Sequence, residues 1–170
     1  EQLRNLGQAV LAEAQKQGAS ACEVDISESA GQNVSVRLGE VETIEYNRDK
    51  GVGITVYLGQ QKGHASTSDF SMPALFETVR AALSIARYTA ADEYAGLADP
   101  ARFAQSFPDL DLYHPWPISV EDAIALATAC EAAGQAVDPR LDNSEGSSVY
   151  ASASRYAYLN SLGFAGSGTV

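Results

Sequence analysis

The side chains best suited to chemistry in this sequence are two histidines, several serines and several carboxylates. His64, Ser66 and Asp69 follow one another closely and have the residue types of a nucleophilic triad. Alternate residues of an extended strand lie about 6.6 Å apart, which is too far for the direct hydrogen bond that activates a serine. We therefore predict a polar strand face that ends in a turn, with His64 half-exposed and hydrogen-bonded to a neighbour.

Metal binding would need several nitrogen, oxygen or sulfur ligands that converge on one point. His64 and His114 stand far apart in the sequence, and neither Cys22 nor Cys130 belongs to a CxxC pair. The sequence therefore predicts no metal ligands in this chain. It also predicts that both cysteines are buried free thiols, which suits a reducing compartment.

Two groups of carboxylates could act as paired acid and base. They are Glu23, Asp25 and Glu28 in one group, and Glu42, Glu45 and Asp49 in the other. Because they alternate with apolar residues, we interpret both groups as solvated sheet faces. The glycines near the end of the chain lack the strand–turn–helix context of a phosphate-binding loop. No catalytic or cofactor-binding residue is predicted.

The balance of charges excludes some classes of partner. The chain has 11 basic and 22 acidic residues, for a net charge of −11, so it should repel the phosphates of nucleic acids. No apolar run approaches the roughly 20 residues of a membrane helix, and no signal peptide is recognised. We expect a cytoplasmic protein. The first residue is Glu1 and the last is Val170, so we expect a piece of a longer chain.

Apolar residues at helical spacing predict helices over 2–17, 71–88 and 120–133. Gly18 and Gly134 are expected to end the first and third helices, and Ser71 and Ser119 to cap the second and third. The buried stripe of the third helix should be Val120, Ile124 and Ala127. The first two helices offer clear apolar stripes as well.

Alternation of apolar and polar residues predicts a meander of about five short antiparallel strands, then two or three more near the end of the chain. The expected strands are 22–27, 34–38, 41–47, 52–58 and 64–68, then two strands within 149–159 and one starting at Phe164. The expected turns are Gly31–Asn33, a Gly39-Glu40 hairpin loop, Asp49–Gly51, Gly59–Gly63 and a turn near Ser154 or Arg155. Gly51 and Gly63 should adopt backbone angles that other residues avoid.

A connection over 89–117 joins the second and third helices and is rich in proline and aromatic residues. Disordered linkers are poor in aromatics, so we expect this segment to lie against the domain. Asp99-Pro100 should start a short helix. Two interpretations stay open, namely an extended wrap over the sheet or a docking surface for a partner subunit.

These elements predict an α+β fold: an antiparallel meander with two or three helices packed on one face. We expect residues 1–89 to form an N-terminal α+β meander and residues 90–117 an ordered connection. Residues 118–170 should add a helix and strands that complete the same domain, before a C-terminal domain that this chain does not contain.

Four blocks of the sequence resemble the TldD/PmbA family, on its PmbA (TldE) side. They are EYNRDKGVGITVYLGQQKGHASTSDFS, IARYTAADEYAGLADP, PDLDLYHPW and AVDPRLDNSEGSSV, in this order. The resemblance implies the N-terminal region of a subunit of a two-subunit bacterial cytoplasmic peptidase. It also implies that zinc is held by a TldD-type partner, on a His-Glu-x-x-x-His helix that this chain lacks.

The expected partners are a TldD-like subunit, a second copy, or both, together with an extended peptide substrate. The alternative is a binding module without a proteolytic role, which recognises an extended peptide at a sheet edge.

Overall fold

The computed structural model describes all residues from 1 to 170, and these divide into two compact units. Unit 1 comprises Glu1–Glu28, Asp49–Leu112 and Arg155–Val170, and unit 2 comprises Ser29–Arg48 and Tyr113–Ser154. Strands of one antiparallel sheet, in the order β3-β2-β1-β4-β5, contribute residues to both units. With three α-helices beside this sheet, the predicted α+β fold is confirmed.

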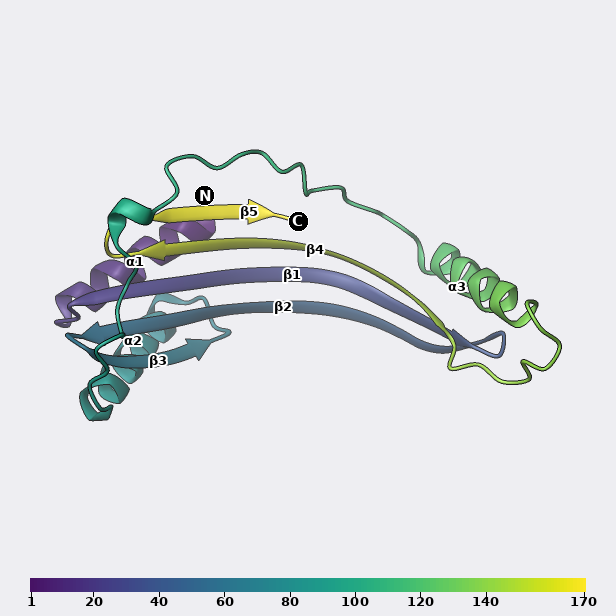
Figure 1. The fold of residues 1–170 in the computed structure, drawn as a ribbon, viewed down its shortest axis with the longest axis horizontal. Coiled ribbons are helices and arrows are strands. Elements are labelled where there is room, and N and C mark those ends of the chain that lie inside the picture. Colours follow the sequence, from purple (N-terminus) through teal and green to yellow (C-terminus); the bar gives the residue numbers. More distant parts are fainter. The chain divides into compact units, whose positions relative to one another are not determined.

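The elements follow one another from the N-terminus as shown in Figure 1. They are α1 (Gln2–Lys16), β1 (Ala21–Arg37), β2 (Glu40–Leu58), β3 (Gln61–Thr67), α2 (Met72–Tyr88), the short 3-10 helix η1 (Pro100–Arg102), α3 (Val120–Gln135), β4 (Ser147–Asn160) and β5 (Ala165–Thr169). The three helices lie within two residues of their predicted bounds, because α1 and α2 have regular apolar stripes and a capping serine marks the start of α3.

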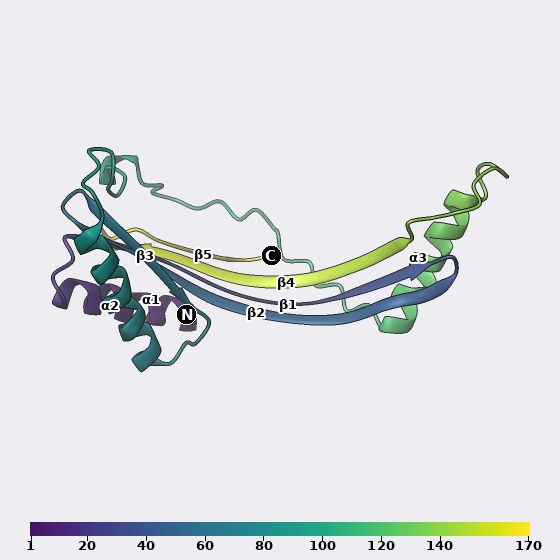
Figure 2. The ribbon, with the colours of Figure 1, turned by 90° about the horizontal axis from the view of Figure 1, so that it is seen from below.

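In unit 1, α1 and α2 lie on one face of the sheet (Figure 2). Alternate residues of the strands point toward these helices, which is the period of a half-buried strand. The core that results comprises Leu3, Val10, Ala14, Cys22, Val24, Ile26, Val52, Ile54, Val56, Leu75, Val79, Ala82, Leu83, Ala86, Ala157 and Leu159. The opposite face of these strands carries polar and aromatic side chains.

The ends of α1 and α2 follow from local residues. Gly18 has φ +92° after the last turn of α1, and its N–H donates to the Gln15 carbonyl, as expected for a glycine that ends a helix. Ser71 occupies the N-cap position of α2 but makes no side-chain cap hydrogen bond. Instead, the Ser71 N–H donates to Asp69 Oδ1 at 2.8 Å. Pro73 lies in the first turn, where a proline costs no helix hydrogen bond.

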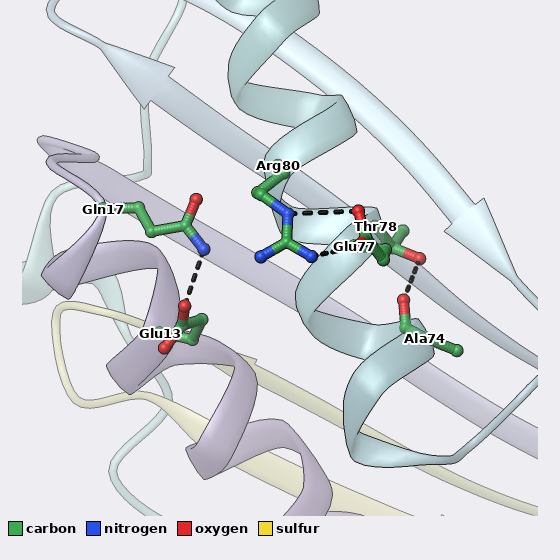
Figure 3. Close-up of polar contacts among 6 residues, drawn as sticks. All are labelled: Glu13, Gln17, Ala74, Glu77, Thr78 and Arg80. Carbon is green, nitrogen blue, oxygen red and sulfur yellow. Dashed lines mark hydrogen bonds and ion pairs between the residues drawn. The ribbon is translucent and has the colours of Figure 1, made fainter.

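Several polar side chains of α1 and α2 form hydrogen bonds within one or two turns of their own helix (Figure 3). Thr78, which is almost fully buried, donates from Oγ1 to the Ala74 carbonyl at 2.8 Å. Arg80 Nε donates to Glu77 at 3.1 Å, one turn away. Exposed pairs of this kind add little to stability, so packing on the sheet holds these helices.

In unit 2, α3 packs on the sheet through a much smaller core. The buried residues are Val34, Val36, Ala123, Ala127 and Val149. Ser119 Oγ accepts from the Asp122 N–H at 3.0 Å, so the predicted cap is confirmed. The predicted stripe was partly wrong, because Val120 and Ile124 are half-buried at the border of this core. Gly134 lies inside α3 instead of ending it.

The strands are longer than predicted because three expected turns do not form. The segments Gly31–Asn33, Asp49–Gly51 and Ser154–Arg155 run straight through β1, β2 and β4. At Gly31, a Cβ would lie 2.8 Å from the Ala151 carbonyl, so the glycine allows close approach of a neighbouring strand. The predicted division into short strands was therefore wrong, since ladder hydrogen bonds outweigh local turn preference.

Two turn predictions were wrong in detail. The β1–β2 hairpin turns at Leu38 and Gly39, with φ of 51° and 79°, one residue before the predicted Gly39-Glu40 loop. Gly51 and Gly63 lie within strands and neither has a positive φ. Gly63 is instead required by packing, because a Cβ there would lie 2.0 Å from the Ala82 carbonyl of α2.

The connection from α2 lies against unit 1 over part of its length. Phe103 and Phe107 each pack edge-on against Phe164, with ring centroids 5.3 and 5.7 Å apart. Asp99 accepts from the Ala101 N–H at 2.9 Å and so starts η1, as predicted. The expectation that this segment lies against the domain is confirmed at these rings. The docking interpretation stays a prediction.

Candidate functional site

The open face of the unit 1 sheet carries a carboxylate held by two phenols. Glu23 lies on β1, between Tyr57 of β2 and Tyr158 of β4. Tyr57 Oη donates to Glu23 Oε1 at 2.8 Å, and Tyr158 Oη donates to Oε2 at 2.5 Å. Neutral donors on both oxygens stabilise the carboxylate and hold the three side chains across three strands.

The two phenols are poor proton acceptors at neutral pH. Burial and the hydrogen bond to Glu23 raise the pKa of Tyr158 to about 12. Burial and the same carboxylate raise the pKa of Tyr57 still further. Both tyrosines therefore remain protonated donors, and the cluster has the chemistry of a structural clasp or a polar binding surface rather than of a general base.

Sequence reasoning missed this clasp, because it interpreted Glu23 as part of a solvated carboxylate group. That interpretation was wrong for Glu23, whereas Glu28 forms an exposed ion pair with Arg155. The signal was present in the alternation of β1, which places Glu23 opposite the buried face. Only the order of the strands shows that Tyr57 and Tyr158 flank it.

The residues that resembled a nucleophilic triad have other partners. His64 is exposed, and its Nδ1 lies 3.0 Å from Thr55 Oγ1 on the paired strand, so the predicted hydrogen bond to a neighbour is confirmed. Ser66 pairs with Gly53 in the same ladder. Asp69 accepts from the Ser71 backbone, and this hydrogen bond holds the pKa of its carboxyl below the usual value.

A groove of about 590 Å³ lies on unit 1 beside the edge strand β5. One wall is the segment 107–112, in which Phe107, Leu110 and Leu112 are exposed apolar residues. The floor includes Gly166 and Gly168, and the ring of Tyr156 lies so close to Gly168 that a Cβ there would be 2.6 Å from Tyr156 Oη. An apolar groove beside an unpaired strand edge is suited to an extended polypeptide.

Unit 2 carries a second hollow, of about 640 Å³, lined by aromatic, proline and small side chains. The lining includes Tyr46, Tyr150 and the segment 114–118, which contains His114 and Trp116. Gln32 closes one side and donates from Nε2 to the Ile118 carbonyl at 2.7 Å. Exposed Trp and Tyr side chains are typical of surfaces that bind other proteins.

Glu131 is the most buried charged side chain of unit 2, with 6% of its surface exposed. Its carboxylate accepts from the N–H groups of Leu38 and Gly39 at 2.8 and 2.9 Å. These hydrogen bonds lower the pKa of Glu131, and the one from the Gly39 N–H has the largest effect. The residue fixes the β1–β2 hairpin to α3. Nothing in the sequence marks this role except the presence of an acidic residue on an otherwise apolar helix face.

The two cysteines differ in burial. Cys22 is buried in the unit 1 core, and burial raises the pKa of its thiol to about 12. Cys130 is exposed on α3, so the prediction of a buried thiol was wrong there. Cys130 is not among the residues that α3 contributes to the core of unit 2, which are Ala123 and Ala127.

No group of three or more His, Cys, Asp or Glu side chains in this chain could hold a metal ion. His64 belongs to unit 1 and His114 to unit 2. The ligand set of a zinc peptidase therefore does not fit the residues of this chain. None of the helices has both the length and the apolar composition needed to cross a membrane.

The comparisons with known proteins agree with this architecture. Residues 22–86 match the PmbA/TldA metallopeptidase domain 1, and residues 113–169 match the PmbA/TldA metallopeptidase central domain. The metalloprotease PmbA homolog of Haemophilus influenzae is 47% identical over 150 residues, which is 88% of this chain and 33% of that protein. Metalloprotease PmbA of Escherichia coli O157:H7 is 49% identical over 126 residues, which is 74% of this chain and 28% of that protein.

Solved structures show the same fold. A proposed modulator of DNA gyrase from Bacteroides thetaiotaomicron aligns with a TM-score of 0.81 and 25% identity, over 98% of this chain and 38% of that one. TldE from Thermococcus kodakarensis aligns with a TM-score of 0.76 and 16% identity, over 96% of this chain and 36% of that one. The chain spans about a third of the length of the curated relatives it matches. Its two matched regions and its fold place it in one family: the chain belongs to the PmbA/TldD metallopeptidase family.

Proposed function

We propose that this chain is the N-terminal part of a PmbA/TldE-type subunit of a two-subunit cytoplasmic peptidase. In this proposal the TldD-type partner binds the zinc, and the present subunit helps to enclose and hold the peptide substrate. The observation that carries the proposal is the match to PmbA proteins along most of the chain. The absence of a fitting ligand set within residues 1–170 is consistent with it.

The exposed apolar surfaces suit an assembling subunit. Phe107, Leu110 and Leu112 are exposed beside the unit 1 groove, and Tyr113 and Trp116 are exposed in unit 2. Prolines in this connection lower the cost of ordering, and burial of the rings would stabilise a complex. We therefore propose that the connection over 103–116 contacts the partner subunit.

The test uses the full-length protein together with the TldD-like protein of the same cell. We expect the two to co-purify, and only the pair to cleave unstructured peptides. Zinc measured on the separated subunits should follow the TldD-like protein. About one zinc per chain and peptide cleavage by the full-length PmbA-like protein alone would contradict the proposal.

Hydrogen exchange tests the docking surface. Addition of the TldD-like protein should protect residues 103–116, whereas residues 72–88, which form α2, serve as an internal reference. If the pair assembles and cleaves peptides but 103–116 gains no protection, the connection is an internal wrap over unit 1 and its docking role is wrong.

A second candidate function is favoured by the groove beside β5. An extended peptide could add to this edge and place apolar side chains between 107–112 and the strand. In that case, Leu110→Asp should weaken peptide binding by the isolated full-length protein. The matched control is Leu126→Asp, since Leu126 is an exposed leucine on α3. Equal peptide binding by both variants would exclude the groove.

A further inference from the structure

The unit 2 part of β2, residues 40–48, has an unpaired edge. β2 lies between β3 and β1, but the register with β3 begins only at Val52 (Figure 1). All residues from 40 to 48 are exposed except Thr43, which is half-buried. No backbone hydrogen bond joins this edge to a loop or a helix. Such an edge is a template for another strand unless its charges prevent pairing.

The sequence along this edge is complementary to itself when it is read in the opposite direction. It reads Glu42-Thr43-Ile44-Glu45-Tyr46-Asn47-Arg48. Antiparallel pairing centred on Glu45 would place Glu42 opposite Arg48, Thr43 opposite Asn47 and Ile44 opposite Tyr46. Residues directly opposite in an antiparallel pair share one face of the sheet, so each of these matches is a side-chain contact.

We propose that residues 42–48 of β2 pair antiparallel with the same residues of a second copy, with Glu45 at the two-fold axis. Symmetry repeats each contact, so one dimer contains two ion pairs of Glu42 with the partner's Arg48. It also contains two contacts of Ile44 with the partner's Tyr46. In the unpaired chain, Ile44 is 46% exposed and Tyr46 is 71% exposed, which is a large apolar area on an edge strand.

Neighbouring registers lose this match. Centring the pair on Ile44 places Glu42 opposite the partner's Tyr46, and centring it on Tyr46 places Ile44 opposite the partner's Arg48. Only the register centred on Glu45 brings opposite charges together and apolar side chains together. Its one unfavourable contact is Glu45 against the partner's Glu45, which weakens the dimer at neutral pH. This pairing rests on β2 alone and does not depend on the peptidase role.

Charge reversal tests the proposal in the full-length protein. Glu42→Arg places two arginines opposite each other, and Arg48→Glu places two glutamates opposite each other. Each variant should weaken self-association about tenfold or more, as measured by sedimentation equilibrium. The control is Glu121→Arg, which makes the same change of charge at an exposed position on α3. Circular dichroism verifies that every variant is folded.

Two combinations of these variants separate pairing from general charge effects. The double variant Glu42→Arg/Arg48→Glu should regain the association of the parent protein, because each opposite-charge pair is restored with its sign reversed. An equimolar mixture of the two single variants should form heterodimers, since both ion pairs are then complementary. The proposal is overturned if the parent is monomeric at about 100 µM, or if the double variant stays as weak as the single ones.

Disulfide cross-linking tests the register itself. The parent for this test carries Cys130→Ser, because Cys130 is exposed. Glu45→Cys should form an intermolecular disulfide on mild oxidation, because opposite Cα atoms lie about 4.5–5.5 Å apart, within disulfide range. Thr43→Cys should not, because two such cysteines would be offset by about 13 Å along the strands. Equal cross-linking of both variants, or of neither, overturns this register.

Discussion

In unit 1, two helices cover the sheet and sixteen buried residues form the core, whereas in unit 2 one helix covers it and the core has five buried residues. Unit 2 compensates with polar contacts: Glu131 holds the hairpin, and Gln32 holds the segment before α3. It also exposes several aromatic side chains around its hollow. A small core with exposed aromatic surface is typical of a region that becomes complete in an assembly.

The largest expected effect is on the packed side of unit 1. Gly63→Val should destabilise the protein by about 3 kcal/mol or more, because the new side chain would collide with the backbone of α2. The measurement is chemical denaturation. Gly51→Val is the control, since a Cβ there meets nothing within 4 Å and its φ is not positive. If both variants unfold at the same denaturant concentration as the parent, Gly63 is not packed tightly against α2.

A smaller loss of stability is expected in unit 2, where the core is small and the Glu131 carboxylate holds the hairpin by hydrogen bonds. Glu131→Gln should lower thermal stability and raise hydrogen exchange at Leu38 and Gly39, because the two N–H groups lose a charged acceptor. Glu145→Gln, at an exposed loop position, is the control. Unchanged exchange at the hairpin would show that Glu131 does not hold it.

The lowered pKa of Glu131 predicts that the stability of the protein decreases in acid. The folded state lowers the pKa of Glu131, so its contribution to stability is present above the unfolded-state pKa of about 4.3. That contribution is lost as pH falls through the lower folded-state value. Melting curves between neutral and acid pH should therefore converge for the parent and Glu131→Gln. A difference that persists unchanged in acid would contradict the proposed cause.

The phenol clasp on the open face of unit 1 should have an effect of about 1 kcal/mol. Tyr158→Phe removes one hydrogen bond to Glu23 without changing the packing of the ring. Tyr94→Phe is the control because Tyr94 is 88% exposed. Equal unfolding free energies for the two variants would mean that the clasp does not stabilise unit 1.

The clasp also predicts late ionisation. Because folding raises the pKa of Tyr158 to about 12, this contribution to stability is present below the unfolded-state value of about 10. It is lost as pH rises through the folded-state value. In an ultraviolet titration, the phenolate signal that Tyr158→Phe removes should lie at about pH 12. If the signal that this substitution removes lies at about pH 10 in the folded protein, the clasp is contradicted.

Chemical labelling of the two thiols, one in each unit, should perturb the protein least. Cys130 should react with a thiol reagent at once, whereas Cys22 should react only on unfolding, because it is buried and its pKa is raised. The rate of each labelled peptide is read by mass spectrometry. Rapid labelling of Cys22 in the folded protein would show that the unit 1 core opens readily.

Some elements were determined by the sequence alone. The apolar stripe of α2, from Leu75 to Ala86, is long enough to specify a helix and its buried face. Gly18 after α1 and Ser119 before α3 mark helix ends through local hydrogen bonds. These features depend on residues within a few positions of one another, which is why a linear pattern can reveal them.

Other features were decided only by tertiary structure. The sequence around Gly31 and around Gly51 favours turns, yet both segments continue as strands, because neighbouring strands bind the backbone there. The partners of Glu23 come from residues far apart in the chain, Tyr57 and Tyr158, which only the order of the strands brings together. Turn preference is a local energy of about 1 kcal/mol, whereas strand pairing and burial act across the whole sheet, so the nonlocal terms prevail.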